Sequence, residues 1–269
     1  MLRGMFSAVA GLRNHQTWLD VIGNNIANVN TAGFKYSRVN FQDTLSQTIT
    51  GPTAPGTPVG GTNARQVGLG ATIGAIDNVQ TQGSLLDTDR VLDLAVQGNG
   101  YFMVSDTLGT YYTRDGAFSL DADGFLVVPS TGFYVLDADG NQIQLPITQT
   151  SPALETISIG RDGGIVGYFD DGTSSQIAII GLARFANPDG LLKVGDNMFS
   201  ETANSGAPQM GAPQTDARGA ISSGYIEMSN VDLAQQFTFM IMAERGFQAN
   251  SRVITTADSM LQELVNIRR

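Results

Sequence analysis

The chain has 269 residues, 42% of them hydrophobic and only 15% charged, so it can bury true cores while much of its surface stays neutral and polar. Its net charge of −10 comes from the middle: residues 1–42 sum to +3, residues 43–227 to −13 and residues 228–269 to 0. This distribution argues against a nucleic-acid binder, which needs a basic stripe. The lack of cysteine excludes disulfides and thiolate chemistry, and no apolar run approaches the ~20 residues of a membrane span.

The first predicted element is a helix over residues 2–29, whose apolar side chains recur at steps near three and four. This stripe consists of Leu2, Met5, Val9, Leu12, Leu19, Ile22, Ile26 and Val29. Gly4, Gly11 and Gly23 each cost about 1 kcal/mol relative to alanine in a helix interior, and few charges cover the outer face. We therefore expect a helix that is marginal alone and that close neighbours stabilise.

The start of this helix imitates a short signal peptide, but its apolar run is too short and the helical stripe continues through it. We interpret it as part of the mature protein. Turn-forming residues around Asn30 and Gly33 should end the helix near Asn28.

The next segment has mixed apolar spacing and suggests a short helix around residues 41–49. Between residues 46 and 64 the chain has no charge, three prolines and four glycines. Such a composition is typical of a flexible connection. We therefore predict a Gly/Pro-rich linker loop over residues 46–66.

Residues 67–224 are predicted to form an antiparallel β-rich domain, because short apolar runs alternate there with Gly and Asx turns. The runs are residues 92–96, 101–104, 110–113, 125–128, 133–136, 157–159, 165–169 and 175–185. The strongest hairpin signals are residues 121–124, 137–140, 162–163 and 171–172. Residues 202–220 are again rich in Gly, Pro and Ser and lead back to a helix.

The last predicted element is a helix over residues 231–267, about 55 Å long at 1.5 Å per residue. Its apolar seam consists of Phe237, Met240, Phe247, Ile254, Leu261 and Val265, with Glu244, Ser251 and Asp258 at the remaining seam positions. Two long helices of similar phase at opposite ends of a chain can pair as a coiled coil. The alternative is that both helices pack on the chain's own β core.

The predicted fold class is therefore α+β: long N- and C-terminal helices paired as a coiled coil, with an inserted antiparallel β-rich domain. Residues 1–45 and 225–269 form the helical assembly domain in this scheme, residues 46–66 the linker and residues 67–224 an outer β domain. An acidic middle between near-neutral ends fits an outward-facing domain between buried termini.

Several segments resemble the axial proteins of the bacterial flagellar rod and hook. They are residues 24–35 (NNIANVNTAGFK), 66–70 (QVGLG), 93–102 (DLAVQGNGYF), 112–118 (YTRDGAF), 229–234 (SNVDLA) and 245–268. The resemblance covers nearly the whole chain in the order that the family shows. It implies a subunit without enzymatic activity or cofactor.

The resemblance also implies a mode of assembly. The subunit would be exported without a cleaved signal through the flagellar export apparatus and would polymerise beneath a cap protein into a hollow helical tube, next to other axial proteins. The terminal helices would form the inner layer and the β domain an outer layer. A segment that is unstable alone remains threadable and folds once neighbours bury it.

Within the family, residues 61–63, 66–70 and 261–268 look most like hook protein. Length favours a distal rod protein, because hook proteins usually carry an additional outer β domain and residues 145–159 leave no room for one. The sequence interpretation favours a compact hook-type protein, with distal rod protein of the basal body as the main alternative.

Candidate assembly residues lie in the two terminal helices and beside them. They are Leu12, Leu19, Asn24, Asn25, Asn28, Gly33, Phe34, Asn230, Phe237, Met240, Phe247, Asn250, Ile254 and Leu261. For the asparagine cluster at residues 24–30 our hypothesis is that its amides satisfy polar groups across subunits, where an unpaired buried amide would cost about 1–3 kcal/mol.

Other functions have weaker support. His15 is the only histidine, so a histidine-dependent active site or metal site would have to use it, and a polar residue on a helix face is the simpler interpretation. The two Asp-Ala-Asp-Gly segments suggest a calcium-dependent adhesion module, but their glycine stands fourth where an EF-hand loop needs it sixth. A hydrolase using Asp115 and Asp162 would require that they converge, which nothing in the sequence indicates.

Overall fold

The computed structural model describes residues 2–56, 60–106, 109–146 and 154–267. The chain divides into two compact units. The helical unit comprises Met1–Ala27, Ser37–Asn78 and Asp232–Arg269, and the β unit comprises Asn28–Tyr36 and Val79–Val231. Two terminal helices and a β-rich middle confirm the α+β class.

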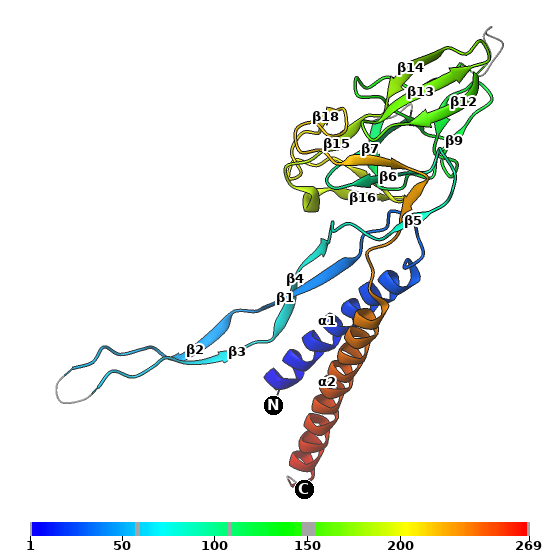
Figure 1. The fold of residues 1–269 in the computed structure, drawn as a ribbon. Coiled ribbons are helices and arrows are strands. Elements are labelled where there is room, and N and C mark those ends of the chain that lie inside the picture. The colour runs from blue at the N-terminus through cyan, green and yellow to red at the C-terminus, as the bar shows by residue number, and fades with distance from the viewer. Residues whose placement is uncertain (1, 57–59, 107–108, 147–153, 268–269) are drawn as a thin grey trace. The chain divides into compact units, whose positions relative to one another are not determined.

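In the helical unit, α1 (Leu2–Ala27) and α2 (Leu233–Ile267) lie side by side (Figure 1). Both helices begin and end within two residues of the predicted positions. Asp232 caps α2, because its Oδ1 accepts hydrogen bonds from the backbone N–H groups of Ala234 at 2.9 Å and Gln235 at 3.3 Å.

Two glycines allow the helices to approach closely. A Cβ atom at Gly246 of α2 would lie 2.5 Å from the His15 ring of α1, and one at Gly11 would lie 2.7 Å from the Asn250 amide. A Cβ atom at Gly4 or at Gly23 would have no neighbour within 4 Å. Gly11 and Gly246 therefore lower the helix propensity but allow the two helices to pack closely. Gly4 and Gly23 lower the helix propensity without such a packing gain.

Four strands complete the helical unit: β1 (Ser37–Asp43) pairs antiparallel with β4 (Ala71–Asn78), and β2 (Ser46–Thr50) with β3 (Arg65–Gly68). The suggested short helix at residues 41–49 is therefore wrong, and the predicted linker at 46–66 contains β2 and the start of β3. Register pairs such as Val39 with Ile76 and Phe41 with Ile73 join residues more than 30 positions apart. Long-range pairing of this kind overrides local apolar spacing.

The β unit is built from short strands, and all of its strand pairs are antiparallel. The strands are β5 (Leu85–Asp87), β6 (Leu94–Gln97), β7 (Tyr101–Asp106), β8 (Gly109–Thr113), β9 (Ser119–Leu120), β10 (Leu126–Val127), β11 (Tyr134–Val135), β12 (Leu154–Ile159), β13 (Gly164–Phe169), β14 (Ser174–Ile179), β15 (Leu182–Arg184), β16 (Leu192–Gly195), β17 (Met198–Ser200), β18 (Gln209–Gly211), β19 (Ala220–Ser223) and β20 (Tyr225–Glu227). A short 3-10 helix, η1 (Pro188–Gly190), precedes β16.

The largest sheet has the order β16-β17-β8-β7-β11-β10-β9, with β15 joining β7 to β18. A three-stranded sheet β12-β13-β14 and the pairs β19-β6 and β20-β5 complete the β unit. The apolar core lies between these sheets and includes Leu94, Phe102, Phe118 and Ile180, all essentially inaccessible to solvent. Phe102 and Phe118 meet edge to face at 5.1 Å, a favourable aromatic geometry.

The predicted turns are confirmed: Gly124, Gly140, Gly163 and Gly172 all adopt positive φ between neighbouring strands or bridges. The single strand predicted over residues 175–185 is wrong, because β14 ends before Gly181. A Cβ atom at Gly181 would lie 2.3 Å from the carbonyl oxygen of Asp137, so the chain passes another backbone segment there. Strands β16 to β20 were not among the predicted runs.

Candidate assembly site

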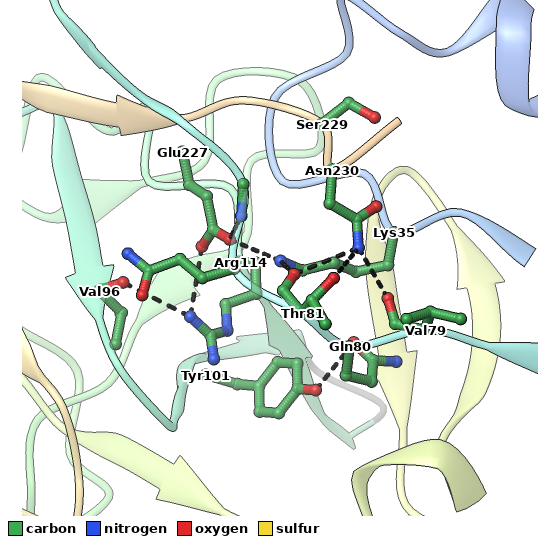
Figure 2. A network of polar contacts seen from close by, with 12 residues as sticks. Lys35, Val79, Gln80, Thr81, Val96, Tyr101, Arg114, Glu227, Ser229 and Asn230 are labelled. Carbon is green, nitrogen blue, oxygen red and sulfur yellow. Dashed lines mark hydrogen bonds and ion pairs between the residues drawn. The ribbon is translucent and has the colours of Figure 1, made fainter. Parts of the chain in front are cut away.

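A buried cluster of charged side chains joins three distant parts of the β unit (Figure 2). Lys35 follows α1 in the sequence, Arg114 follows β8, and Glu227 ends β20. The side chains of Lys35 and Glu227 are completely buried, and that of Arg114 is 5% exposed. The sequence analysis did not find this cluster, since charged residues spaced so far apart carry no local signal.

Glu227 is the centre of the cluster. Its Oε1 accepts hydrogen bonds from Lys35 Nζ at 2.5 Å and from the N–H of Gly83 at 2.9 Å, and its Oε2 accepts one from Arg114 Nη1 at 3.2 Å. Lys35 Nζ also donates to the carbonyl oxygen of Thr81 at 2.7 Å. Burial lowers the pKa of Lys35, and the Glu227 carboxylate opposes this shift by favouring the charged amine.

Arg114 extends the cluster toward a buried tyrosine. Its Nη2 donates to the carbonyl oxygen of Gly98 at 2.8 Å, and its guanidinium lies 5.0 Å from the centre of the Tyr101 ring. The Tyr101 hydroxyl donates to Gln80 Oε1 at 3.0 Å. Burial raises the pKa of Tyr101 to about 12, against an opposing effect of the Arg114 charge, so the hydroxyl keeps its proton.

Asn230 forms hydrogen bonds with backbone segments of the β unit that lie next to the points where the chain passes to the other unit. Its Oδ1 accepts the N–H of Tyr36 at 2.9 Å, and its Nδ2 donates to the carbonyl oxygen of Val79 at 2.8 Å and to Thr81 Oγ1 at 2.9 Å. Tyr36, Val79 and Val231 are the residues of the β unit at three of the four points where the chain passes between units. One amide therefore fixes the backbone beside all three.

Gly33 and Phe34, also predicted assembly residues, belong to the same region of the β unit. The N–H of Gly33 donates to the carbonyl oxygen of Glu227 at 2.8 Å, and a Cβ atom at Gly33 would lie 2.6 Å from the backbone nitrogen of Asp115. Its φ of 68° is a further reason for glycine. Phe34 is buried, with Lys193 Nζ 4.6 Å from its ring centre.

Asn25 and Asn28 of the predicted asparagine cluster form hydrogen bonds within the chain. Asn25 is 1% exposed; its Nδ2 donates to the carbonyl oxygen of Ser37 at 2.9 Å and to Gln236 Oε1 at 3.2 Å, while its Oδ1 accepts the N–H of Ser37 at 3.0 Å. Asn28 Oδ1 accepts from Thr31 Oγ1 at 3.2 Å. Asn25 thus has partners for its amide within the chain, and partners across subunits stay a prediction for this cluster. Asn24 lies exposed on α1.

The face of α2 that packs on α1 differs in part from the predicted seam. Met240, Ile254, Leu261 and Asn250 are partly buried, as are Leu12 and Leu19 of α1. The second row of the seam consists of Gln236, Ala243, Asn250 and Ala257. Of the predicted second row, Phe237, Glu244 and Asp258 are exposed and Ser251 is partly buried. Alanine and glutamine carry little hydropathy, so the apolar pattern did not indicate Gln236, Ala243 and Ala257.

Phe237 and Phe247 instead face outward, with 49% and 39% of their surface exposed. They belong to a larger set of exposed apolar side chains on α2: Leu233, Phe237, Ile241, Met242, Phe247, Val253, Met260, Leu264, Val265 and Ile267. Exposed apolar surface of this extent marks an interaction site.

Residues considered for chemistry have structural partners. His15 lies 6.0 Å from Trp18 and 6.2 Å from Phe41 between ring centres, and burial lowers its pKa. Asp115 accepts the N–H of Ala117, and Asp162 that of Gly164, as in turns. Within the described residues, no three His, Cys, Asp or Glu side chains gather as a metal site would require. None of the described helices has the length and apolarity of a bilayer span.

Three family models match the chain in sequence order. "Flagella basal body rod protein" matches residues 5–35, "Flagellar hook protein FlgE/F/G D1 domain" residues 95–167 and "Flagellar basal body rod FlgEFG protein C-terminal" residues 222–267. These families are structural. The matched ranges include most of α1, the centre of the β unit and all of α2.

Curated relatives match over the full chain. "Flagellar basal-body rod protein FlgG" of Bacillus subtilis is 49% identical over 270 positions, covering 100% of both chains, and the same-named protein of Agrobacterium fabrum is 38% identical, covering 96% of this chain and 97% of the relative. "Flagellar hook protein FlgE" of Borreliella burgdorferi is 30% identical, with 100% of both chains covered over 441 positions. The hook-type interpretation is thus less favoured than the rod. The chain belongs to the flagellar hook and rod axial protein family.

Proposed function

We propose that this protein is a distal rod subunit, which polymerises with copies of itself into the tube of the flagellar basal body. Its alignment with the Bacillus subtilis rod protein is almost free of length difference, at 270 positions for 269 residues. The alignment with the hook protein needs 441 positions, so that protein carries a long segment without a counterpart here. Length and identity support the rod.

The observation that carries self-assembly is the uncovered apolar surface of α2. Phe237, Ile241, Val265 and Ile267 are about half exposed or more, although a solvated helix places charged residues on such a face. In our proposal, neighbouring subunits cover this surface, and α1 and α2 pair as a coiled coil in the inner layer of the tube. The acidic β unit faces outward.

The proposal assigns different roles to the predicted assembly residues. Phe237 and Phe247 contact neighbouring subunits. Met240, Asn250, Ile254 and Leu261, with Leu12 and Leu19, hold the two helices of one subunit together. Asn25, Asn28, Gly33, Phe34 and Asn230 shape the segments between the units. Export in an unfolded state agrees with helices that owe much of their stability to neighbours.

The test compares two exposed apolar residues in different units. Phe237→Asp places a charge on the proposed contact surface, whereas Leu192→Asp changes a residue of β16 that is 60% exposed. We expect Phe237→Asp to abolish polymers in sedimentation and electron microscopy, and Leu192→Asp to polymerise as the wild type does. Equal polymer yield from both variants contradicts the proposal.

A compact hook subunit is the second candidate, supported by the 30% identity to a hook protein of the same family. Deleting the gene in its own bacterium separates the two. Basal bodies with shortened rods identify a rod subunit, whereas complete rods without hooks identify a hook subunit.

A further inference from the structure

A cavity of about 180 Å³ lies within the β unit, next to the buried charged cluster. Its lining includes Gln80, Tyr101, Arg114, Arg184, Phe185 and Pro188. Since a water molecule occupies about 30 Å³ of liquid volume, the cavity has room for a small polar group with several atoms.

Two buried hydrogen-bond donors of this lining have no partner among the described residues. They are Arg114 Nε and Gln80 Nε2. Arg114 is 4% exposed, and its other nitrogens donate to Glu227, Val96 and Gly98. Figure 2 shows Arg114 and Gln80 on either side of Tyr101, whose hydroxyl already donates to the Gln80 oxygen. An unpaired buried donor is costly, so these two N–H groups require an acceptor.

The charges around the cavity call for a negative acceptor. Lys35 and Arg114 share the single carboxylate of Glu227, which leaves one positive charge in excess. Arg184 adds another; its Nη1 donates to the carbonyl oxygen of Asp216 at 3.0 Å, which is a neutral partner. The carboxylate of Asp189 in η1 lies near enough to raise the pKa of Tyr101, but its side chain is exposed, so solvent screens its negative charge.

We propose that this cavity binds a carboxylate group. Its oxygens would accept hydrogen bonds from Arg114 Nε and Gln80 Nε2, with Arg184 adding positive charge. The apolar faces of Phe185 and Pro188 suit the carbon atoms that carry the group. A carboxylate is preferred over a phosphate because its single negative charge matches the one excess positive charge of the buried cluster, whereas Arg184 is partly exposed to solvent.

The test is a titration of the full chain, kept dilute, with sodium acetate and with sodium chloride at equal ionic strength. The Nε–H signal of Arg114 in two-dimensional NMR reports directly on the proposed contact. We expect a saturable shift with acetate and none with chloride. A shift that does not saturate, or one that chloride reproduces, overturns the proposal.

Three variants locate the site. Arg184→Gln should weaken acetate binding about tenfold, and Gln80→Glu should abolish it, because the new carboxylate replaces a donor and repels the anion while retaining the acceptor for Tyr101. Arg161→Gln removes the same charge from an exposed arginine elsewhere in the β unit and should bind acetate normally. Equal loss in Arg161→Gln and Arg184→Gln contradicts a specific site.

The carboxylate could come from solution or from an Asp or Glu side chain of a second copy, and the second source relies on the proposed function. If a second copy supplies it, saturating acetate should slow polymerisation, and Gln80→Glu should polymerise less than Arg161→Gln. If polymerisation is indifferent to both while acetate binds, the ligand is a free carboxylate. Failure of the wild type to polymerise counts against the proposed function and leaves the acetate result standing.

Discussion

The two units of this protein bury apolar side chains in very different ways. Of the described residues, the helical unit contributes only five buried hydrophobic side chains, three of them alanines: Ala8, Ile22, Val39, Ala243 and Ala257. The β unit contributes all the others, including its aromatic core. Most of the exposed large apolar side chains belong to the helical unit.

This difference indicates which unit gains more stability from its own buried apolar surface. Burial of apolar surface stabilises by roughly 25 cal/mol per Å², so the β unit, which holds nearly all large buried side chains, gains most of this stabilisation. The helical unit has small residues between its helices and large residues outside. We therefore expect its stability to depend on what covers these outer side chains.

The largest effect should come from the charged cluster of the β unit. Glu227→Gln leaves Lys35 and Arg114 buried without their counter-charge and should cost about 3–5 kcal/mol of unfolding free energy. Urea unfolding followed by the near-ultraviolet circular dichroism of the tyrosines measures this, because all seven tyrosines belong to the β unit. Asp216→Asn is the control, since Asp216 pairs with Arg218 while 79% exposed. Similar losses in both variants would contradict a central role for Glu227.

Two glycines of the helical unit test whether its helices pack as closely in solution as in the structure. Gly23→Ala should stabilise α1 by up to about 1 kcal/mol, because open space surrounds the new methyl group. Gly246→Ala should lose this gain, since its methyl group would press on the His15 ring, and overpacking costs about 1–3 kcal/mol. The fluorescence of Trp18, the only tryptophan, reports on this unit. If both variants shift the Trp18 melting temperature upward equally, the close helix contact is absent in solution.

Dilution should affect the two units unequally. If neighbours cover α2, a tenfold dilution lowers the apparent unfolding free energy of the helical unit by up to about 1.4 kcal/mol for each partner lost. The Trp18 transition should then move to lower temperature while the tyrosine transition stays in place. Two transitions that coincide at every concentration would remove the distinction between the units.

The smallest effect at neutral pH concerns two buried tyrosines. Burial raises the pKa values of Tyr101 and Tyr112 to about 12, from an ordinary value of 10.0. The folded chain keeps these protons where the unfolded chain has lost them, so stability falls as the pH rises from 10 toward 12. Alkaline titration by tyrosinate absorbance should show late-ionising groups that Tyr101→Phe and Tyr112→Phe each reduce by one. Ionisation of all seven tyrosines together near pH 10 would contradict this.

Sequence patterns predicted the elements whose signals are local. The stripe of Leu12, Leu19 and Ile22 marks α1, and the Asp-Gly turns mark hairpins, because both depend on residues a few positions apart. Strand pairing between residues 37–43 and 71–78 depends on distant partners, so the local spacing at 41–49 suggested a helix. The same reason explains why the cluster of Lys35, Arg114 and Glu227 was missed, since its members are up to 192 positions apart.

The packed row of α2 was misplaced for a different reason. By hydropathy, Phe237 and Phe247 are the expected packing residues of α2. The residues that are buried instead are Ala243 and Ala257, whose small side chains allow close helix packing. In a subunit with a second interface, the most apolar residues of a helix need not face its partner within the chain. Such a helix has one pattern of residues that pack within the chain and a second pattern of exposed apolar residues. A single apolar stripe matches neither pattern completely.

The position of Asn230 has a mechanical consequence. Its side chain forms hydrogen bonds with Tyr36 and Val79, and its backbone continues directly into Val231. Three of the four points where the chain passes between the units therefore lie next to this one residue. A pull on the chain at Tyr36 or Val79 therefore acts against hydrogen bonds of the same side chain that holds the other point.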